Sequence, residues 1–264
     1  MEALHSYRRV QTRSDSGAAT CWGVPEEAAI EIGFNGQAWT VMLATPADLA
    51  DLAVGIAVSE DAIRDPTRIR DLHVHRYAEG FAVDVEVDAE GLDVSMLRRR
   101  ALDGITGCGL CGVERLADAV RRPQRQSGQR PTIASESIAR AFNALAEHQP
   151  LNRATRTVHA AAWCAPDGDI LLVREDIGRH NALDKLIGAL HRGGLTTEPG
   201  FITLSSRCSF ELVSKAARTV AGVLATLSAP TGMALDLACE LQLPVACRGP
   251  EDQVMWFPGG THGG

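Results

Sequence analysis

The sequence has few aromatic residues, no long apolar run and no excess of basic residues. Aromatic side chains make up 5% of the 264 residues, and 26 lysines and arginines are outnumbered by 33 aspartates and glutamates. The resulting net charge of −7 argues against the phosphate backbone of a nucleic acid as the main partner. No apolar stretch approaches the roughly 18 residues of a membrane-spanning helix. We therefore expect neither a nucleic acid nor a membrane as a partner.

The N-terminal residues lack the apolar stretch of about 7 to 15 residues that a secretory signal contains. Seven cysteines are an odd number, and their spacing is not that of a disulfide scaffold. Free thiols are typical of a reducing compartment. We expect a cytoplasmic protein in which some thiols react. Four others lie among apolar residues and are expected to be buried, namely Cys164, Cys208, Cys239 and Cys247.

The hydropathy pattern divides the chain into three parts. Residues 1–22 are polar without a sustained period, which predicts a mobile leader. Residues 23–104 read as a small α+β domain. It has strands at 29–34 and 38–43 around an Asn35-Gly36 turn, a helix opened by Thr45 and Pro46, and an alternating strand at 81–87. Residues 105–264 form the third part.

In the third part, strands alternate with helices from residue 157 onward, which favours a sheet with helices on both faces. The expected strands are 157–164, 169–174, 201–204, 223–227 and 245–247, and the expected helices are 182–190, 210–220 and 233–241. Asp167 and Gly168, between the first two strands, predict a hairpin turn. A further helix is expected after Ser135 and Ser137, either of which could cap it. The basic, turn-rich segment 121–131 is expected to be a solvated loop, with a docking surface for an acidic partner as the alternative.

Two thiols, Cys108 and Cys111, lie in the glycine-rich segment TGCGLCG at 106–112. This spacing suits a structural zinc site, a dithiol redox motif or a thiolate that carries sulfur as a persulfide. A closed zinc site needs four ligands, and the other cysteines form no second close pair. The glycines free the backbone to move, which favours sulfur transfer. The spacing alone leaves metal and thiol chemistry open.

Three turns that follow strands in the third part carry polar residues. They cover 174–181, 205–207 and 228–232. Ligands of open α/β sheets gather at the carboxyl ends of parallel strands, where such turns meet. Hydroxyls, helix N-termini and arginines suit a phosphate or pyrophosphate. Alternatively, the hydroxyls only cap helices and the arginines pair with Glu175, Asp176 or Glu211. Three such turns together favour a ligand pocket.

The sequence resembles the formate dehydrogenase accessory sulfurtransferases of the FdhD type. The resemblance rests on TGCGLCG at 106–112, VREDIGRHNALDK at 173–185, SSRCSFELVSKAAR at 205–218 and TLSAPTGMALDLA at 226–238, and it extends over most of residues 27–250. It implies an α/β fold, with a cytidine-deaminase-like α/β/α C-terminal domain and a smaller α+β N-terminal roll. A zinc deaminase is excluded because His159 is followed by Ala160 and Ala161, without the proton-shuttling glutamate.

The resemblance also implies a function. Such proteins are sulfur carriers that take persulfide sulfur from a cysteine desulfurase and transfer it to the bis-molybdopterin guanine dinucleotide molybdenum cofactor, before insertion into formate dehydrogenase. The client of this chain is expected to be formate dehydrogenase or a related molybdenum or tungsten enzyme. By resemblance the protein is a homodimer, and we expect no permanently bound metal. The alternatives are a cofactor-binding chaperone without sulfur chemistry and a C-x-x-C metal-binding module.

The resemblance assigns the persulfide to Cys108 and matches Cys111 to the second cysteine of the family. The turn residues expected to bind the cofactor are Arg174, Arg179, His180, Ser205, Arg207, Ser228 and Thr231. The tail aligned with the family's cofactor-contacting segment reads Asp252, Gln253, Val254, Met255, Trp256 and Phe257, which departs from the family's usual pattern.

Overall fold

The computed structural model describes residues 6–93, 122–123 and 130–257. Residues 28–87 build a four-stranded sheet in the order β4-β3-β6-β5. Its strands are β3 (Ala28–Phe34), β4 (Gln37–Ala44), β5 (Ile69–Arg76) and β6 (Gly80–Val87). Asn35 and Gly36 both have positive φ, at 51° and 77°, as a two-residue hairpin turn requires. The predicted hairpin is therefore confirmed, while β5 was not predicted.

Helix α1 (Leu49–Ser59) packs on one face of this sheet and buries its apolar stripe there. The expectation that Thr45 and Pro46 open the helix is wrong, because its N-cap is Asp48 in a left-handed conformation. The Thr45 hydroxyl instead accepts the Ile177 backbone N–H at 3.1 Å. Thr45 is thus used for contact with the C-terminal part of the chain.

The second sheet has six strands in the order β12-β11-β10-β9-β7-β8. They are β7 (His159–Cys164), β8 (Ile170–Asp176), β9 (Phe201–Leu204), β10 (Leu224–Thr226), β11 (Val245–Arg248) and β12 (Val254–Trp256). Strands β9, β10 and β11 are mutually parallel, and β7 is antiparallel to both of its neighbours. The five predicted strands of this region are confirmed to within a few residues.

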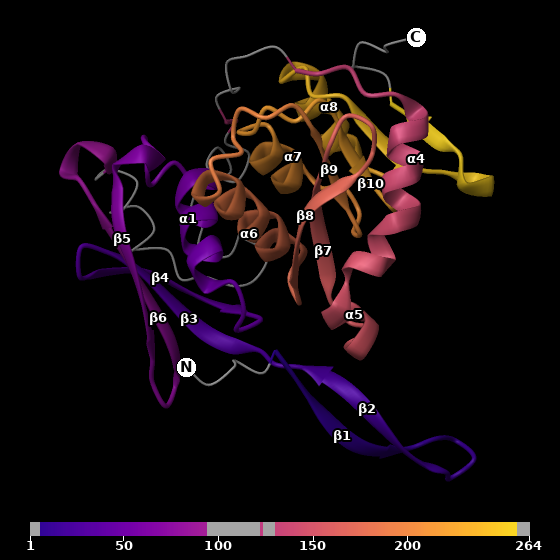
Figure 1. Cartoon of the computed structure of the whole chain (residues 1–264), viewed down its shortest axis with the longest axis horizontal. Helices are drawn as coiled ribbons and strands as arrows, with labels where there is room; N and C mark the ends of the chain where they lie inside the picture. Colours follow the sequence, from indigo (N-terminus) through magenta and orange to yellow (C-terminus); the bar gives the residue numbers. More distant parts are fainter. Residues whose placement is uncertain (1–5, 94–121, 124–129, 258–264) are drawn as a thin grey trace.

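Helices cover both faces of the six-stranded sheet, as the alternating pattern predicts (Figure 1). One face carries α6 (Arg179–Arg192), α7 (Phe210–Ala216) and α8 (Gly232–Glu240), and the other carries α4 (Ser135–Ala144). A short helix, α5 (Pro150–Thr155), precedes β7. Neither Ser135 nor Ser137 caps α4, whose N-cap is Ala134.

The two sheets are joined through α1 and α6, which lie side by side between them (Figure 1). The contact depends on two glycines. A Cβ on Gly55 would lie 1.7 Å from the Asp184 carbonyl oxygen, and one on Gly188 would lie 1.8 Å from the Asp51 carbonyl oxygen. The helix backbones therefore touch directly, and this close contact fixes the N-terminal sheet against the C-terminal domain.

The described part of the predicted leader is a β-hairpin. Strands β1 (Tyr7–Arg13) and β2 (Ala19–Pro25) pair in antiparallel register, and the hairpin extends away from the body (Figure 1). The leader prediction is wrong for these residues because it relied on the missing apolar period. A hairpin that is exposed on both faces needs no apolar period. A turn in which the Gly17 N–H donates to the Ser14 carbonyl joins the two strands.

The described ends of the basic segment 121–131 contact the body of the protein. Arg122 forms a 3.1 Å ion pair with Glu240. Arg130 donates to the carbonyls of Thr219 and Ala221 after α7. The remainder of this segment and the predicted boundary at 104/105 lie outside the described residues. In the part of the chain that the structure describes, no helix is long and apolar enough to cross a membrane.

Candidate functional site at the carboxyl edge of the sheet

The segment that holds Cys108 and Cys111 lies outside the described residues. The structure therefore leaves the assignment of these thiols as a prediction from the sequence. The predicted ligand turns can be placed, because they fall within residues 174–232.

The turns that follow β8, β9, β10 and β11 lie at the same edge of the six-stranded sheet, which we call the carboxyl edge. Strands β9, β10 and β11 are parallel, and β8 runs in their direction because β7 is antiparallel to both β8 and β9. The carboxyl edge comprises residues 177–181, 205–209, 227–231 and 249–253. The three predicted turns therefore lie at one edge, as expected, and a fourth turn joins them; ligand binding by these turns stays a prediction.

A buried ion pair fixes the first turn. Lys185 and Asp176 are both fully buried, and their Nζ and Oδ2 atoms lie 2.7 Å apart. Asp176 also accepts the backbone N–H groups of Thr45 and Gly178 and a side-chain N–H of Asn181. These bonds hold the beginning of α6. Because one of them comes from Thr45, the N-terminal domain helps to position the side chains that follow at the carboxyl edge.

Arg179 and His180 follow this ion pair in the first turn of α6. His180 Nε2 lies 3.8 Å from Glu211 Oε2 on α7. The interaction with His180 lowers the pKa of Glu211 to about 2, against the opposing effect of burial. His159, at the start of β7, has its pKa lowered by burial and by the positive charge of Arg179. This edge thus carries one arginine and two imidazole groups, and one of the imidazoles, His180, lies beside the Glu211 carboxylate.

The sequence prediction missed His159 and Glu211. His159 was considered only as a metal ligand, and Glu211 only as a partner for an arginine. His159 comes close to Arg179 and His180 because β7 is inserted antiparallel between β8 and β9, which places His159 opposite Asp176. That strand order is not visible in a local sequence pattern.

The second and third turns place hydroxyls and one arginine at the same edge. Ser205 Oγ accepts the Ala160 N–H at 2.8 Å, so it ties β7 to the end of β9. Thr231 caps α8 by accepting the Ala234 N–H at 3.3 Å. Arg207 and Ser228 are exposed. The capping alternative therefore explains Thr231, while Arg207 and Ser228 are open to solvent.

Arg174 does not belong to the turn in which the sequence analysis placed it. It lies within β8, and its Nε donates to Asp51 Oδ2 of α1 at 2.7 Å. Arg192 binds the other oxygen of this buried carboxylate. Arg174 therefore contributes to the contact between α1 and the C-terminal domain.

The C-terminal tail leaves the carboxyl edge after its first two residues. Asp252 forms a 3.0 Å ion pair with Arg248, and Gln253 ends the turn. Val254, Met255 and Trp256 form β12, which runs antiparallel to β11. The indole of Trp256 donates to Ser135 Oγ at 2.9 Å. Phe257 packs against the core. Asp252 and Gln253 thus lie at the carboxyl edge, and the exposed Met255 side chain lies against Gly249 of the same edge.

The described cysteines divide into buried and exposed thiols. Cys164, Cys208 and Cys247 are buried as expected. Burial raises the pKa of Cys164 and Cys208 to about 12, which leaves both thiols protonated and unreactive. The expectation that Cys239 is buried is wrong, because it lies on the solvent side of α8; Cys21 is also exposed.

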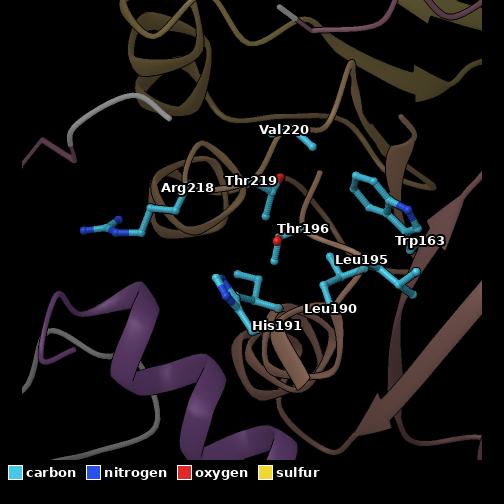
Figure 2. A pocket seen from close by; sticks show the side chains of 9 residues that line it. Trp163, Leu190, His191, Leu195, Thr196, Arg218, Thr219 and Val220 are labelled. Atoms are coloured by element: carbon cyan, nitrogen blue, oxygen red, sulfur yellow. The ribbon is translucent and has the colours of Figure 1, made fainter. Parts of the chain in front are cut away.

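A small cavity lies at the opposite end of the sheet from the carboxyl edge. It is lined by residues that include Trp163, His191 and Thr219 (Figure 2). Its volume of about 20 Å³ accommodates about one water molecule and no nucleotide. Among the described residues, no group of three or more His, Cys, Asp or Glu side chains could hold a metal ion.

Comparisons with known proteins agree on one family. The model of the FdhD/NarQ family matches residues 25–259. The sulfur carrier protein FdhD of Chromobacterium violaceum is 44% identical over 229 residues, which are 85% of each chain. That of Agrobacterium fabrum is 40% identical over 254 residues, which are 94% of each chain. That of Variovorax paradoxus is 42% identical over 84% of this chain and 80% of its own.

A protein of known crystal structure has the same fold. A protein of Desulfotalea psychrophila, described as a formate dehydrogenase accessory protein, superposes with a TM-score of 0.72 over 95% of both chains at 17% identity. The similarity supports the mixed α/β architecture. Because the family model covers nearly the whole described structure, the chain belongs to the FdhD/NarQ family.

Proposed function

We propose that this chain is a sulfur carrier that serves formate dehydrogenase. The observation that carries the proposal is the match of residues 25–259 to the FdhD/NarQ family, together with 40–44% identity to proteins named sulfur carrier protein FdhD. The two cysteines of TGCGLCG at 106–112 supply the thiol chemistry that such a carrier needs. The proposal includes a cytoplasmic location, a homodimer and a deaminase-like arrangement of the C-terminal domain.

In the proposed reaction, the Cys108 thiolate attacks the outer sulfur of a persulfide on a cysteine desulfurase. The sulfur–sulfur bond of the donor breaks, its cysteine leaves as a thiolate, and Cys108 becomes a persulfide. One sulfur–sulfur bond forms for each one broken, so this step requires no external oxidant or reductant. In release, the Cys111 thiolate attacks the inner sulfur on Cys108, so that a Cys108–Cys111 disulfide forms and the outer sulfur leaves as sulfide to its acceptor. A cellular thiol then reduces the disulfide by exchange. The protein is thus a persulfide-forming sulfurtransferase.

The proposed acceptor is the molybdenum cofactor that carries two guanine dinucleotides, held as a substrate. The carboxyl edge supports this assignment, because Arg179 and the exposed Arg207 can pair with phosphate oxygens. The N-terminus of α8 and the hydroxyls of Ser228 and Thr231 add donors for an anion. His180 and Ser205 line the same edge. Arg174, Trp256 and Phe257 are left out of the proposed contacts, since they contact Asp51, Ser135 and the core.

Replacing Cys108 with alanine should lower formate dehydrogenase activity in cells at least tenfold, because no thiol is left at the persulfide position. The measurement is formate oxidation in a strain that expresses the variant as its only copy. Cys239→Ala, at an exposed thiol on α8, is the matched control and should retain activity. Full activity with Cys108→Ala would point to a cofactor-binding chaperone and contradict sulfur transfer.

Replacing Arg179 with glutamine should weaken the binding of GDP, a probe for the guanine dinucleotide ends, by about tenfold. This loss corresponds to about 1.4 kcal/mol, which is typical of one hydrogen bond to a charged group. The measurement is isothermal titration calorimetry on the full chain. Arg70→Gln on β5, 71% exposed and remote from the carboxyl edge, should bind as the wild type does. Equal affinities of all three proteins would place the nucleotide elsewhere.

A further inference from the structure

The chain contains only two lysines, and both are buried. Of its 26 basic residues 24 are arginines, so Lys185 and Lys215 stand out. Lys185 is fully buried, and Lys215 is 7% exposed. They lie in the segments 173–185 and 205–218, two of those that carry the family resemblance. A chain that uses arginine at every other basic position keeps lysine at two buried ones, which indicates that these sites need an ammonium group.

Lys185 joins the end of β8 to the segment before α1. An ammonium group has three N–H donors, and three oxygen atoms surround this one. They are Asp176 Oδ2 at 2.7 Å and the carbonyl oxygens of Thr45 and Glu175 at 3.0 and 3.4 Å. Asp176 also accepts the Thr45 N–H at 3.0 Å. Both members of the ion pair are therefore bonded to Thr45, just before α1 begins.

Lys215 repeats this arrangement at the other end of α1. Its Nζ donates to Asp184 Oδ1 at 2.9 Å, to Ser59 Oγ at 2.9 Å and to Glu60 Oε1 at 3.3 Å. The Ser59 hydroxyl donates to Asp184 Oδ1 at 2.6 Å. Asp184 and Ser59 are both buried. Both members of this second ion pair are therefore bonded to Ser59, the last residue of α1.

Arginine cannot take either place. A guanidinium is planar and larger than an ammonium group, and it carries five N–H donors where each site offers three acceptor groups. The remaining donors would be buried without acceptors, which is costly. The contacts thus explain why these two positions carry lysine.

The two ion pairs also lie next to the first two turns of the carboxyl edge. Asp176 directly precedes the turn 177–181. Asp184 follows His180 by one helical turn on α6, and Lys215 follows Glu211 by one turn on α7. The contact of His180 with Glu211 and that of Asp184 with Lys215 therefore join α6 and α7 at two successive levels. Because α7 follows the turn 205–209, holding α7 also holds this second turn.

We propose that Lys185 and Lys215 are positioning residues of the candidate site. Lys185 fixes the turn 177–181 to one end of α1, and Lys215 fixes the turn 205–209 to the other end. Helix α1 of the N-terminal domain thereby becomes part of the framework of the ligand site. The effect on ligand affinity rests on the proposed function, whereas the order of the two turns is a property of the free protein.

Amide hydrogen–deuterium exchange of the free full chain, read by mass spectrometry, tests the positioning without a ligand. Lys185→Arg should speed exchange in peptides covering 177–182 by about tenfold, and Lys215→Arg should do so in peptides covering 205–213, as expected for lost bonds to charged groups. Arg192→Met is the matched control. It breaks an ion pair between α6 and α1 at the far end of α6 and should leave both segments unchanged. Exchange that rises equally along the whole chain would show that the lysines act on stability alone, and it would overturn the proposal.

Ser59→Ala is a milder variant, because it removes one hydroxyl and keeps the ion pair of Lys215 with Asp184. It should speed exchange in 205–213 by about fivefold, the effect of one hydrogen bond, and leave 177–182 unchanged. It should also weaken GDP binding in isothermal titration calorimetry by about fivefold, while Arg192→Met binds as the wild type does. Unchanged exchange, or an unchanged affinity for GDP, would contradict the proposal. If the wild type itself does not bind GDP, the ligand assignment fails, and the exchange measurements still decide the positioning.

Discussion

Replacing Lys185 with methionine should lower the free energy of unfolding by about 3–5 kcal/mol, the cost of removing one partner from a buried ion pair. Lys185 and Asp176 are both fully buried, and 2.7 Å separates their charged atoms. Without the ammonium group, the Asp176 carboxylate stays in a site that excludes water. Lys185 Nζ also donates to the Thr45 carbonyl at 3.0 Å, so the substitution weakens the contact between the two domains as well.

Urea unfolding followed by circular dichroism measures this loss. Arg70→Met is the matched control, because it breaks an ion pair with Asp88 in which the arginine is largely exposed. Exposed pairs contribute about 0–1 kcal/mol, so its effect should be small. The double variant Asp176→Asn with Lys185→Met should recover part of the stability, since no charge is left unpaired. A loss below about 1 kcal/mol for Lys185→Met alone would show that the pair does not fix this turn.

Local sequence patterns predicted most of the second sheet and its helices. The turn dipeptides Asn35-Gly36 and Asp167-Gly168 mark two hairpins, and both form. These signals succeed because they depend on backbone preferences of neighbouring residues. The β1–β2 hairpin and β12 were missed for the opposite reason. The β1–β2 hairpin is exposed on both faces and so shows no apolar period, and β12 is an edge strand of only three residues.

The candidate site was predictable where it follows from strand direction. The turns after β9 and β10 meet because the strands are parallel, and the sequence shows each turn separately. Arg174 was placed wrongly because its partner, Asp51, lies 123 residues away on α1. The proximity of His180 and Glu211 likewise depends on how α6 and α7 lie on the sheet. Such long-range pairs leave no signal in local spacing.

Whether Cys108 becomes a persulfide is measured most directly by the intact mass of the protein after incubation with a cysteine desulfurase and cysteine. The wild type should gain about 32 Da, one sulfur atom, because a thiolate accepts the outer sulfur of the donor persulfide. The gain should disappear on treatment with a reducing thiol. Cys239→Ser should gain the same mass, because its thiol is exposed but lies outside the proposed motif.

The decisive comparison is with Cys108→Ser under the same conditions. The account predicts no added sulfur on this variant, while Cys111→Ser still accepts one. If Cys108→Ser gains 32 Da as readily as the wild type, sulfur is carried by another residue and the central claim is wrong.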